Sequence, residues 1–132
     1  MKIVPAVGLV AATFLLAFAP KSNLKGTWIY AGGYYNGKLD SAPTDYQLQR
    51  KYTASSFEAF VVEQGSKPEK FQAGDYTLTT DSCLETETYN AQSTKLTGVT
   101  LHYHYEFRND TLFLKGHLPS GMDVLEYWKK AK

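Results

Sequence analysis

The chain has 132 residues, of which 14 are Lys or Arg and 13 are Asp or Glu, and this length corresponds to one domain. Its single cysteine excludes an internal disulfide and a zinc site built from several thiolates, and its near-neutral charge disfavours nucleic-acid binding. Ten Tyr, seven Phe and two Trp favour β-strands, because aromatic side chains suit a pleated, half-buried surface.

The N-terminal segment has the pattern of a secretory signal peptide. Lys2 precedes an uncharged and largely apolar stretch, residues 3–20. A membrane-spanning helix is the alternative, and it needs about 20 apolar residues. Pro5 and Gly8 shorten the helical part to about a dozen residues, which favours the signal peptide.

The cleavage point is less well defined. Residues 17–19, Ala-Phe-Ala, supply a small-x-small pattern, although the following Pro20 is unfavourable for cleavage. We expect residues 1–19 to be the signal peptide and residues 20–132 to form the mature domain. The protein is then periplasmic or secreted, with no stable membrane span after signal cleavage.

The remainder of the chain predicts consecutive strands. Apolar and polar residues alternate with a period of two, and no segment has a sustained helical period. The eight predicted strands are residues 24–30, 45–52, 57–63, 71–79, 83–89, 99–107, 111–117 and 124–130.

Turn signals separate these strands. Gly32-Gly33 and Asn36-Gly37 indicate turns after the first strand, and residues 108–110 indicate a tight hairpin. No connection is long enough for the crossover helix that parallel strands need, so we expect an antiparallel sheet.

Barrel closure removes the two exposed edges that such a sheet would otherwise have, and an eight-stranded barrel can hold one small ligand. An open sandwich is the alternative, but its Greek-key crossings need longer connections. The sequence therefore predicts an all-β fold, an eight-stranded antiparallel up-and-down barrel.

Short motifs resemble those of a known family. Residues 24–28, Leu-Lys-Gly-Thr-Trp, resemble the Gly-x-Trp signature on the first strand of lipocalins. A second resemblance is to the small exported lipocalin-like proteins of Bacteroidetes-type bacteria, a family largely of unknown function. Five short segments of this chain are similar to motifs of that family and occur in the same order: residues 74–78, 85–89, 101–105, 110–116 and 126–130. The chain departs from that pattern at Cys83, where the family tends to have an aromatic residue, and at Glu87, where an apolar residue is common.

The resemblance implies a lipocalin-like barrel and gives Trp28 a structural role. In lipocalin barrels this tryptophan plugs the closed end and commonly stacks on a basic side chain near the last strand. The candidates for that partner are Arg108, Lys129 and Lys130.

Tyrosines on strand faces are the main functional candidates. In the barrel interior their rings and hydroxyls can line a pocket, and the alternative is that they fill the core. Arg50 shares a face with Tyr46 and Tyr52. In the interior it suits a carboxylate-bearing ligand, whereas a register shift of one residue would place it on the surface. The predicted ligand-binding residues are Tyr30, Arg50, Tyr52, Tyr76, Tyr103 and Tyr105.

One strand carries a possible metal-binding pattern. His102, His104 and Glu106 share a face, and two imidazoles with a carboxylate can ligate zinc or iron. Their neighbours form the more apolar set, so we favour a solvated outer face for these three residues.

The strand at residues 83–89 carries the other reactive side chains. Glu85 and Glu87 share a face with Cys83, and paired carboxylates can act as acid and base. Alternating charges are more often the solvated side of a strand, and nothing near the cysteine resembles an activating motif for a nucleophile. We interpret Cys83 as a buried apolar filler or an unpaired thiol.

We therefore expect an exported, non-enzymatic, lipocalin-like barrel that binds a small, mostly apolar or amphipathic molecule. No catalytic residue, metal or cofactor and no nucleic-acid partner is predicted. The alternative is a non-catalytic interaction module of the cell envelope with a filled core. A cavity that opens between strand ends favours the binder, and a filled interior with an exposed apolar patch favours the module.

Overall fold

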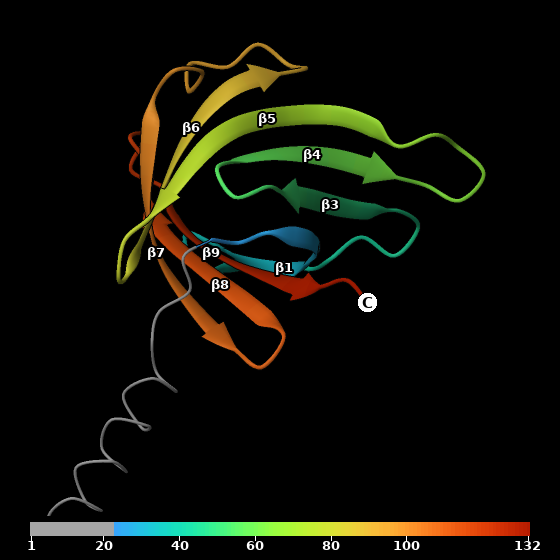
Figure 1. The fold of residues 1–132 in the computed structure, drawn as a ribbon, viewed down its shortest axis with the longest axis horizontal. Coiled ribbons are helices and arrows are strands. Elements are labelled where there is room, and N and C mark those ends of the chain that lie inside the picture. Colours follow the sequence, from blue (N-terminus) through green and yellow to red (C-terminus); the bar gives the residue numbers. More distant parts are fainter. Residues whose placement is uncertain (1–22) are drawn as a thin grey trace, which may run out of the picture.

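The computed structural model describes residues 23–132, so the predicted signal peptide, residues 1–19, lies outside the described residues. Within residues 23–132 all regular structure is β-strand. The strands are β1 (Gly26–Tyr35), β2 (Lys38–Asp40), β3 (Gln47–Tyr52), β4 (Ser56–Val62), β5 (Glu69–Leu78), β6 (Ser82–Asn90), β7 (Thr100–Arg108), β8 (Thr111–His117) and β9 (Asp123–Lys130) (Figure 1). This part of the chain has no helix that is long and apolar enough to cross a membrane.

One antiparallel sheet contains all of these strands, and it closes on itself. From β3 to β9 each strand pairs with the next one in the sequence. The first strand pairs with β3 and also with β9, from Trp28 opposite Lys130 to Tyr35 opposite Val124. The predicted eight-stranded antiparallel barrel is confirmed, with β2 as one additional strand (Figure 1).

The additional strand β2 pairs with the end of β1, which is longer than predicted. The predicted turn at Gly32-Gly33 is wrong. β1 continues through both glycines, and its register against β9 shifts at Gly32, which has a φ of 116°. This positive φ forms a bulge and not a turn. The other predicted turn, at Asn36-Gly37, is confirmed: its φ values are 52° and 79°, and it folds β2 back onto the end of β1.

The two ends of the barrel differ in their connections. At one end, here called the closed end, they are short and comprise residues 53–55, 79–81 and 109–110. At the other, here called the open end, they are longer and comprise residues 41–46, 63–68, 91–99 and 118–122. Longer connections leave room between the strand ends, so a binding site is expected at the open end.

Packed side chains fill the closed end. Leu24 lies across it, because its N–H donates to the Tyr76 hydroxyl at 2.8 Å and its carbonyl accepts from Trp28 Nε1 at 2.8 Å. The Tyr76 hydroxyl in turn donates to the Thr53 carbonyl at 2.6 Å. The chain entering β1 is thereby fixed over the end of the barrel.

Trp28 stacks on one of its three candidate partners. Lys130 Nζ lies 4.8 Å from the centroid of the indole ring, whereas Arg108 lies over Phe113 instead. Lys130 is exposed and also donates to the Lys25 carbonyl at 2.8 Å. Because the ammonium group is solvated, this cation–π contact is worth about 0.5–1 kcal/mol.

We expect Trp28→Ala to lower the free energy of unfolding by about 3–5 kcal/mol, because a large buried aromatic side chain leaves a cavity. Lys130→Met is expected to lower it by about 0.5–1 kcal/mol. Urea denaturation measures both values, with the exposed Leu39→Ala as a control. Wild-type stability in the Trp28→Ala protein would contradict this placement of the ring.

Candidate functional site

A cavity of about 250 Å³ lies in the open half of the barrel. Its apolar wall residues are Leu48, Phe57, Phe71, Leu96, Leu101 and Leu118. The aromatic wall residues with a polar atom are Tyr30, Tyr35, Tyr103 and Trp128. The remaining wall residues are polar or charged: Asp40, Arg50, Gln72, Glu85, Glu87 and Glu126. The cavity therefore combines an apolar body with convergent polar groups, as small-molecule sites do.

Three of the predicted ligand-binding residues line this cavity, namely Tyr30, Arg50 and Tyr103. The other three are buried in the core but do not line the cavity: Tyr52, Tyr76 and Tyr105. The side chains of these three tyrosines point into the barrel, but each residue lies nearer the closed end than the cavity does. Two residues along a strand cover about 6.6 Å, so Tyr52 and Tyr105 share faces with Arg50 and Tyr103 without reaching the same depth.

The hydroxyls of these closed-end tyrosines bind other parts of the barrel. Tyr105 donates to the Thr79 carbonyl at 2.8 Å, and Tyr52 accepts from Arg50 at 2.8 Å. Tyr46, which shares the predicted face of Arg50, precedes β3 and is among the exposed large hydrophobic residues. The alternation of β3 does not extend back to it.

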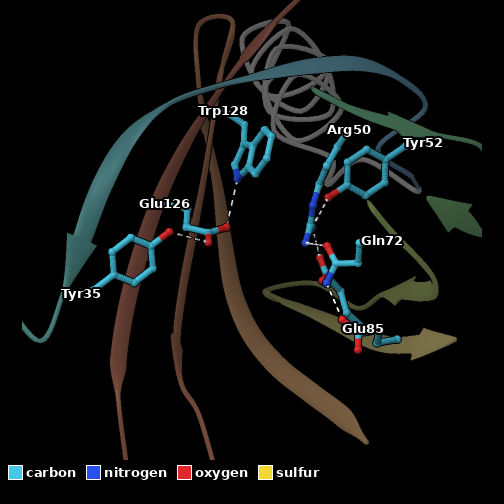
Figure 2. A network of polar contacts seen from close by, with 8 residues as sticks. Tyr35, Arg50, Tyr52, Gln72, Glu85, Glu126 and Trp128 are labelled. Carbon is cyan, nitrogen blue, oxygen red and sulfur yellow. Dashed lines mark hydrogen bonds and ion pairs between the residues drawn. The ribbon is translucent and has the colours of Figure 1, made fainter. Parts of the chain in front are cut away.

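Arg50 is buried, so its predicted face is the interior one. Its Nη1 lies 2.8 Å from Glu85 Oε2 and also 2.8 Å from the Tyr52 hydroxyl, to which it donates (Figure 2). Its Nη2 donates to Gln72 Oε1 at 3.3 Å. The guanidinium therefore has a carboxylate partner within the protein.

Aromatic rings also contact this guanidinium. Arg50 Cζ lies 4.4 Å from the centroid of Phe57 and 5.3 Å from that of Trp128. A buried charge is tolerated only when it is paired and hydrogen-bonded, and Arg50 meets both conditions.

The expectation of a solvated face for Glu85 and Glu87 is wrong. Both are buried on the inward face of β6, at 3% and 6% exposure. The side chains of β6 do alternate as predicted, but the face of Glu85 and Glu87 is the inward one, because it also carries the fully buried Cys83. Arg50 opposite them supplies the charge that makes a buried Glu85 possible.

Glu87 is held by neutral donors at the rim of the cavity. Its Oε2 accepts from Gln72 Nε2 at 2.7 Å and from Asn90 Nδ2 at 3.0 Å, and its Oε1 accepts from the Thr97 hydroxyl at 3.0 Å. These bonds tie the connection between β6 and β7 to the barrel wall.

Burial controls the protonation of the groups on β6. Burial raises the pKa of Glu85 above its ordinary value, and the nearby Arg50 guanidinium opposes that shift. Burial also raises the pKa of the Cys83 thiol to about 12. Below that pH the thiol stays neutral, so Cys83 is not an activated nucleophile.

A second polar network crosses from β1 to β9. Tyr30 donates to Asp40 Oδ2 at 2.8 Å, and its hydroxyl oxygen lies 3.3 Å from that of Tyr35. Glu126 accepts from the Tyr35 hydroxyl at 3.0 Å and from Trp128 Nε1 at 3.1 Å (Figure 2). Burial raises the pKa of Tyr30 to about 12, so its hydroxyl remains a neutral donor at physiological pH.

Sequence reasoning missed most of this second network. Tyr35 and Asp40 belong to the β1–β2 hairpin. The predicted turn at Gly32-Gly33 ends the first strand before this hairpin, so the prediction does not include it. Glu126 shares a strand face with Trp128, so an inward assignment of Trp128 would have found it.

Two consecutive residues of β5 line the cavity because of a bulge. Gln72 pairs with Ala59, whereas the next pair joins Phe60 to Lys70, so Phe71 is the extra residue. Both Phe71 and Gln72 reach the cavity wall. A strict period of two cannot predict two such neighbours on one face.

Tyr103 enters the cavity from β7, opposite Gly116 of β8. A Cβ at Gly116 would lie 2.8 Å from Tyr103 Cδ1, so the glycine makes room for the ring. Tyr103 is 7% exposed, and its hydroxyl has no hydrogen-bond partner among residues 23–132.

The histidine pair lies outside the cavity. His102, His104 and Glu106 are all exposed, as favoured from the sequence. His102 Nε2 lies 2.8 Å from the Ser82 hydroxyl, and Glu106 pairs with Arg108. Within the described residues no group of three or more His, Cys, Asp or Glu side chains is placed to hold a metal ion.

A comparison of the sequence with protein-family models finds no matching family, and a comparison with curated proteins finds no matching relative.

We expect Arg50→Met and Glu85→Leu each to lower the free energy of unfolding by about 3–5 kcal/mol, because each leaves one buried charge unpaired. The double variant should lose less than either single variant, since it leaves no unpaired charge. Urea denaturation of the four proteins gives the coupling energy.

The exposed pair Lys70–Glu58 is a matched control, with Nζ and Oε2 3.3 Å apart. Its coupling should be below about 1 kcal/mol. If the loss of unfolding free energy in the double variant equals the sum of the losses from Arg50→Met and Glu85→Leu, the buried-pair interpretation is wrong.

Proposed function

We propose that this protein is an exported, lipocalin-like barrel that binds one small, mostly apolar or amphipathic molecule in the cavity at its open end. The observation that carries the proposal is the cavity of about 250 Å³ between a packed closed end and the longer connections. Export itself rests on the signal-peptide pattern of residues 1–19.

The volume of the cavity limits the ligand. A cavity of about 150 Å³ can hold one benzene ring, so this one has room for a ring with a short substituent. Apolar side chains such as Leu48 and Leu101 supply contact area, and the polar wall groups supply orientation. We therefore expect a ligand of about one ring in size and not a long lipid chain.

An interaction module of the cell envelope is the second candidate. Six large hydrophobic side chains are exposed on or beside the open end: Tyr34, Leu39, Tyr46, Tyr89, Val99 and Met122. Exposed apolar groups can mark a docking surface for another protein. The cavity favours the ligand-binding proposal over this one, because a filled core is what the module requires.

Filling the cavity tests the ligand-binding proposal. Wild-type protein from its native source should release a stoichiometric small molecule on denaturation, detected by mass spectrometry. Adding that molecule at a hundredfold excess over its Kd should raise the Tm by on the order of 10 °C. Leu101→Trp should abolish both effects, because the indole occupies the cavity.

Leu125→Trp is the matched control, because Leu125 lies on the outer surface of β9. It should retain the molecule and the Tm shift. If repeated preparations yield no molecule, and a library of lipids and small molecules gives no shift, the interaction module is the better function.

A further inference from the structure

Negatively charged side chains outnumber positively charged ones on the cavity wall. The wall carries four carboxyl groups and one guanidinium: Asp40, Glu85, Glu87, Glu126 and Arg50. The guanidinium is matched by Glu85, and both of these side chains are at least nine-tenths buried. An excess of negative charge therefore remains at the cavity after the internal pair is counted.

The remaining carboxylates have neutral partners only. Glu126 accepts hydrogen bonds from a phenol and an indole, and Asp40 accepts one from a phenol. Glu87 accepts from two amides and a hydroxyl. In residues 23–132 none of these three forms a salt bridge. Asp40 is exposed, whereas Glu87 is buried and Glu126 is partly buried. Because like charges repel more strongly where water is excluded, an added cation would be favoured near Glu87 and Glu126.

The network from Asp40 to Glu126 also lacks a proton when both carboxylates are ionised. The Tyr30 proton goes to Asp40 and the Tyr35 proton goes to Glu126. No proton is then left to form a hydrogen bond between the Tyr30 and Tyr35 hydroxyl oxygens, which lie 3.3 Å apart. A ligand that donates hydrogen bonds would complete this network, whereas a ligand that only accepts them would not.

Tyr103 supplies an independent indication of a polar ligand group. Its side chain is more than nine-tenths buried, yet its hydroxyl has no partner among the described residues. Every fully enclosed side-chain N or O atom in that part of the chain has a partner, so this hydroxyl must open onto accessible space. Tyr103 lines the cavity, which is the space it can reach.

The carboxylates act on this same hydroxyl. Burial raises the pKa of Tyr103 above its ordinary value, and Glu85 and Glu126 raise it further. Tyr103, Glu85 and Glu126 all line the same cavity, so one ligand group in it can lie between the hydroxyl oxygen and a carboxylate. The rings of Tyr30 and Trp128, whose centroids are 5.3 Å apart, lie on the same side of the cavity wall as Glu126.

We propose that the ligand is a small organic cation, a protonated amine on an apolar body of about one ring. Its ammonium group donates to Glu126 and to the Tyr103 hydroxyl, and its apolar body contacts the leucine and aromatic side chains. Arg50 organises the wall through Glu85 and does not bind a ligand carboxylate. This inference rests on the proposed ligand-binding function.

Three probes of similar size and different charge test it on the mature protein. They are 2-phenylethylamine, 2-phenylethanol and 3-phenylpropionate, each titrated by calorimetry at neutral pH. The amine should bind at least about tenfold more tightly than the alcohol, because only its group forms charge-assisted hydrogen bonds. The carboxylate should bind most weakly.

Three variants test which side chains bind the ammonium group of the amine. Glu126→Gln should weaken amine binding at least about tenfold and leave alcohol binding unchanged, because it removes the charge, while the amide oxygen can still accept from Trp128 Nε1 and the amide N–H can donate to the Tyr35 hydroxyl. Tyr103→Phe should weaken amine binding about fivefold without lowering the Tm, since its hydroxyl has no partner inside the protein. Glu106→Gln, on the outer face of β7, is the control and should bind like wild type.

The outcomes separate this inference from the function on which it rests. Alcohol or carboxylate binding as tight as amine binding would overturn the cation and keep a ligand-binding barrel. Equal amine binding by the wild type and by Glu126→Gln would overturn the assigned contact and the cationic ligand with it. Binding of none of the three probes overturns the cationic ligand, and the co-purification experiment then decides whether any ligand is bound.

Discussion

The pairing of β1 with β9 is the constraint on which the rest of the structure depends. It closes the sheet, and closure decides which face of every strand is interior. It also brings two segments that are about ninety residues apart into contact, so that Tyr35 of β1 meets Glu126 of β9. At the other end of the same pairing, Lys130 reaches the ring of Trp28.

Closure produces two halves with different physical character. The closed half is filled by rings and aliphatic side chains, and its polar atoms bind the backbone of neighbouring segments, as Tyr76 and Tyr105 do. The open half keeps a cavity whose wall includes an ion pair between Arg50 and Glu85. Replacing a buried ion pair by apolar residues is often neutral or stabilising. Its presence in the wall is therefore better explained by the shape it gives the cavity than by stability.

The fold was predictable because it depends on alternation, which the sequence shows directly. Seven of the predicted strands agree with β3–β9 to within two residues at every end, and the hairpin at residues 108–110 is present. The β1–β2 hairpin was not predicted, because Gly32-Gly33 is equally suited to a turn and to a bulge. Which of the two forms depends on β9, a partner far away in the sequence.

The candidate site was predictable only in part. Inward tyrosines and Arg50 follow from the alternation, and Tyr30, Arg50 and Tyr103 do line the cavity. Alternation does not predict how deep along the barrel a side chain lies, so it cannot separate Tyr52, Tyr76 and Tyr105 from the tyrosines that line the cavity. The buried Glu85 was missed because a carboxylate is normally solvated, and its partner Arg50 lies 35 residues earlier in the chain.

The two indole N–H groups give the most direct test of a ligand site confined to the open half. Trp28 Nε1 donates to Leu24 at the closed end, and Trp128 Nε1 donates to Glu126 in the cavity wall. In ¹H–¹⁵N NMR spectra these are the two indole signals of the protein. We expect titration with 2-phenylethylamine to shift the Trp128 signal and to leave the Trp28 signal in place. A shift of the Trp28 signal alone, or of both signals equally, would contradict a binding site in the open half.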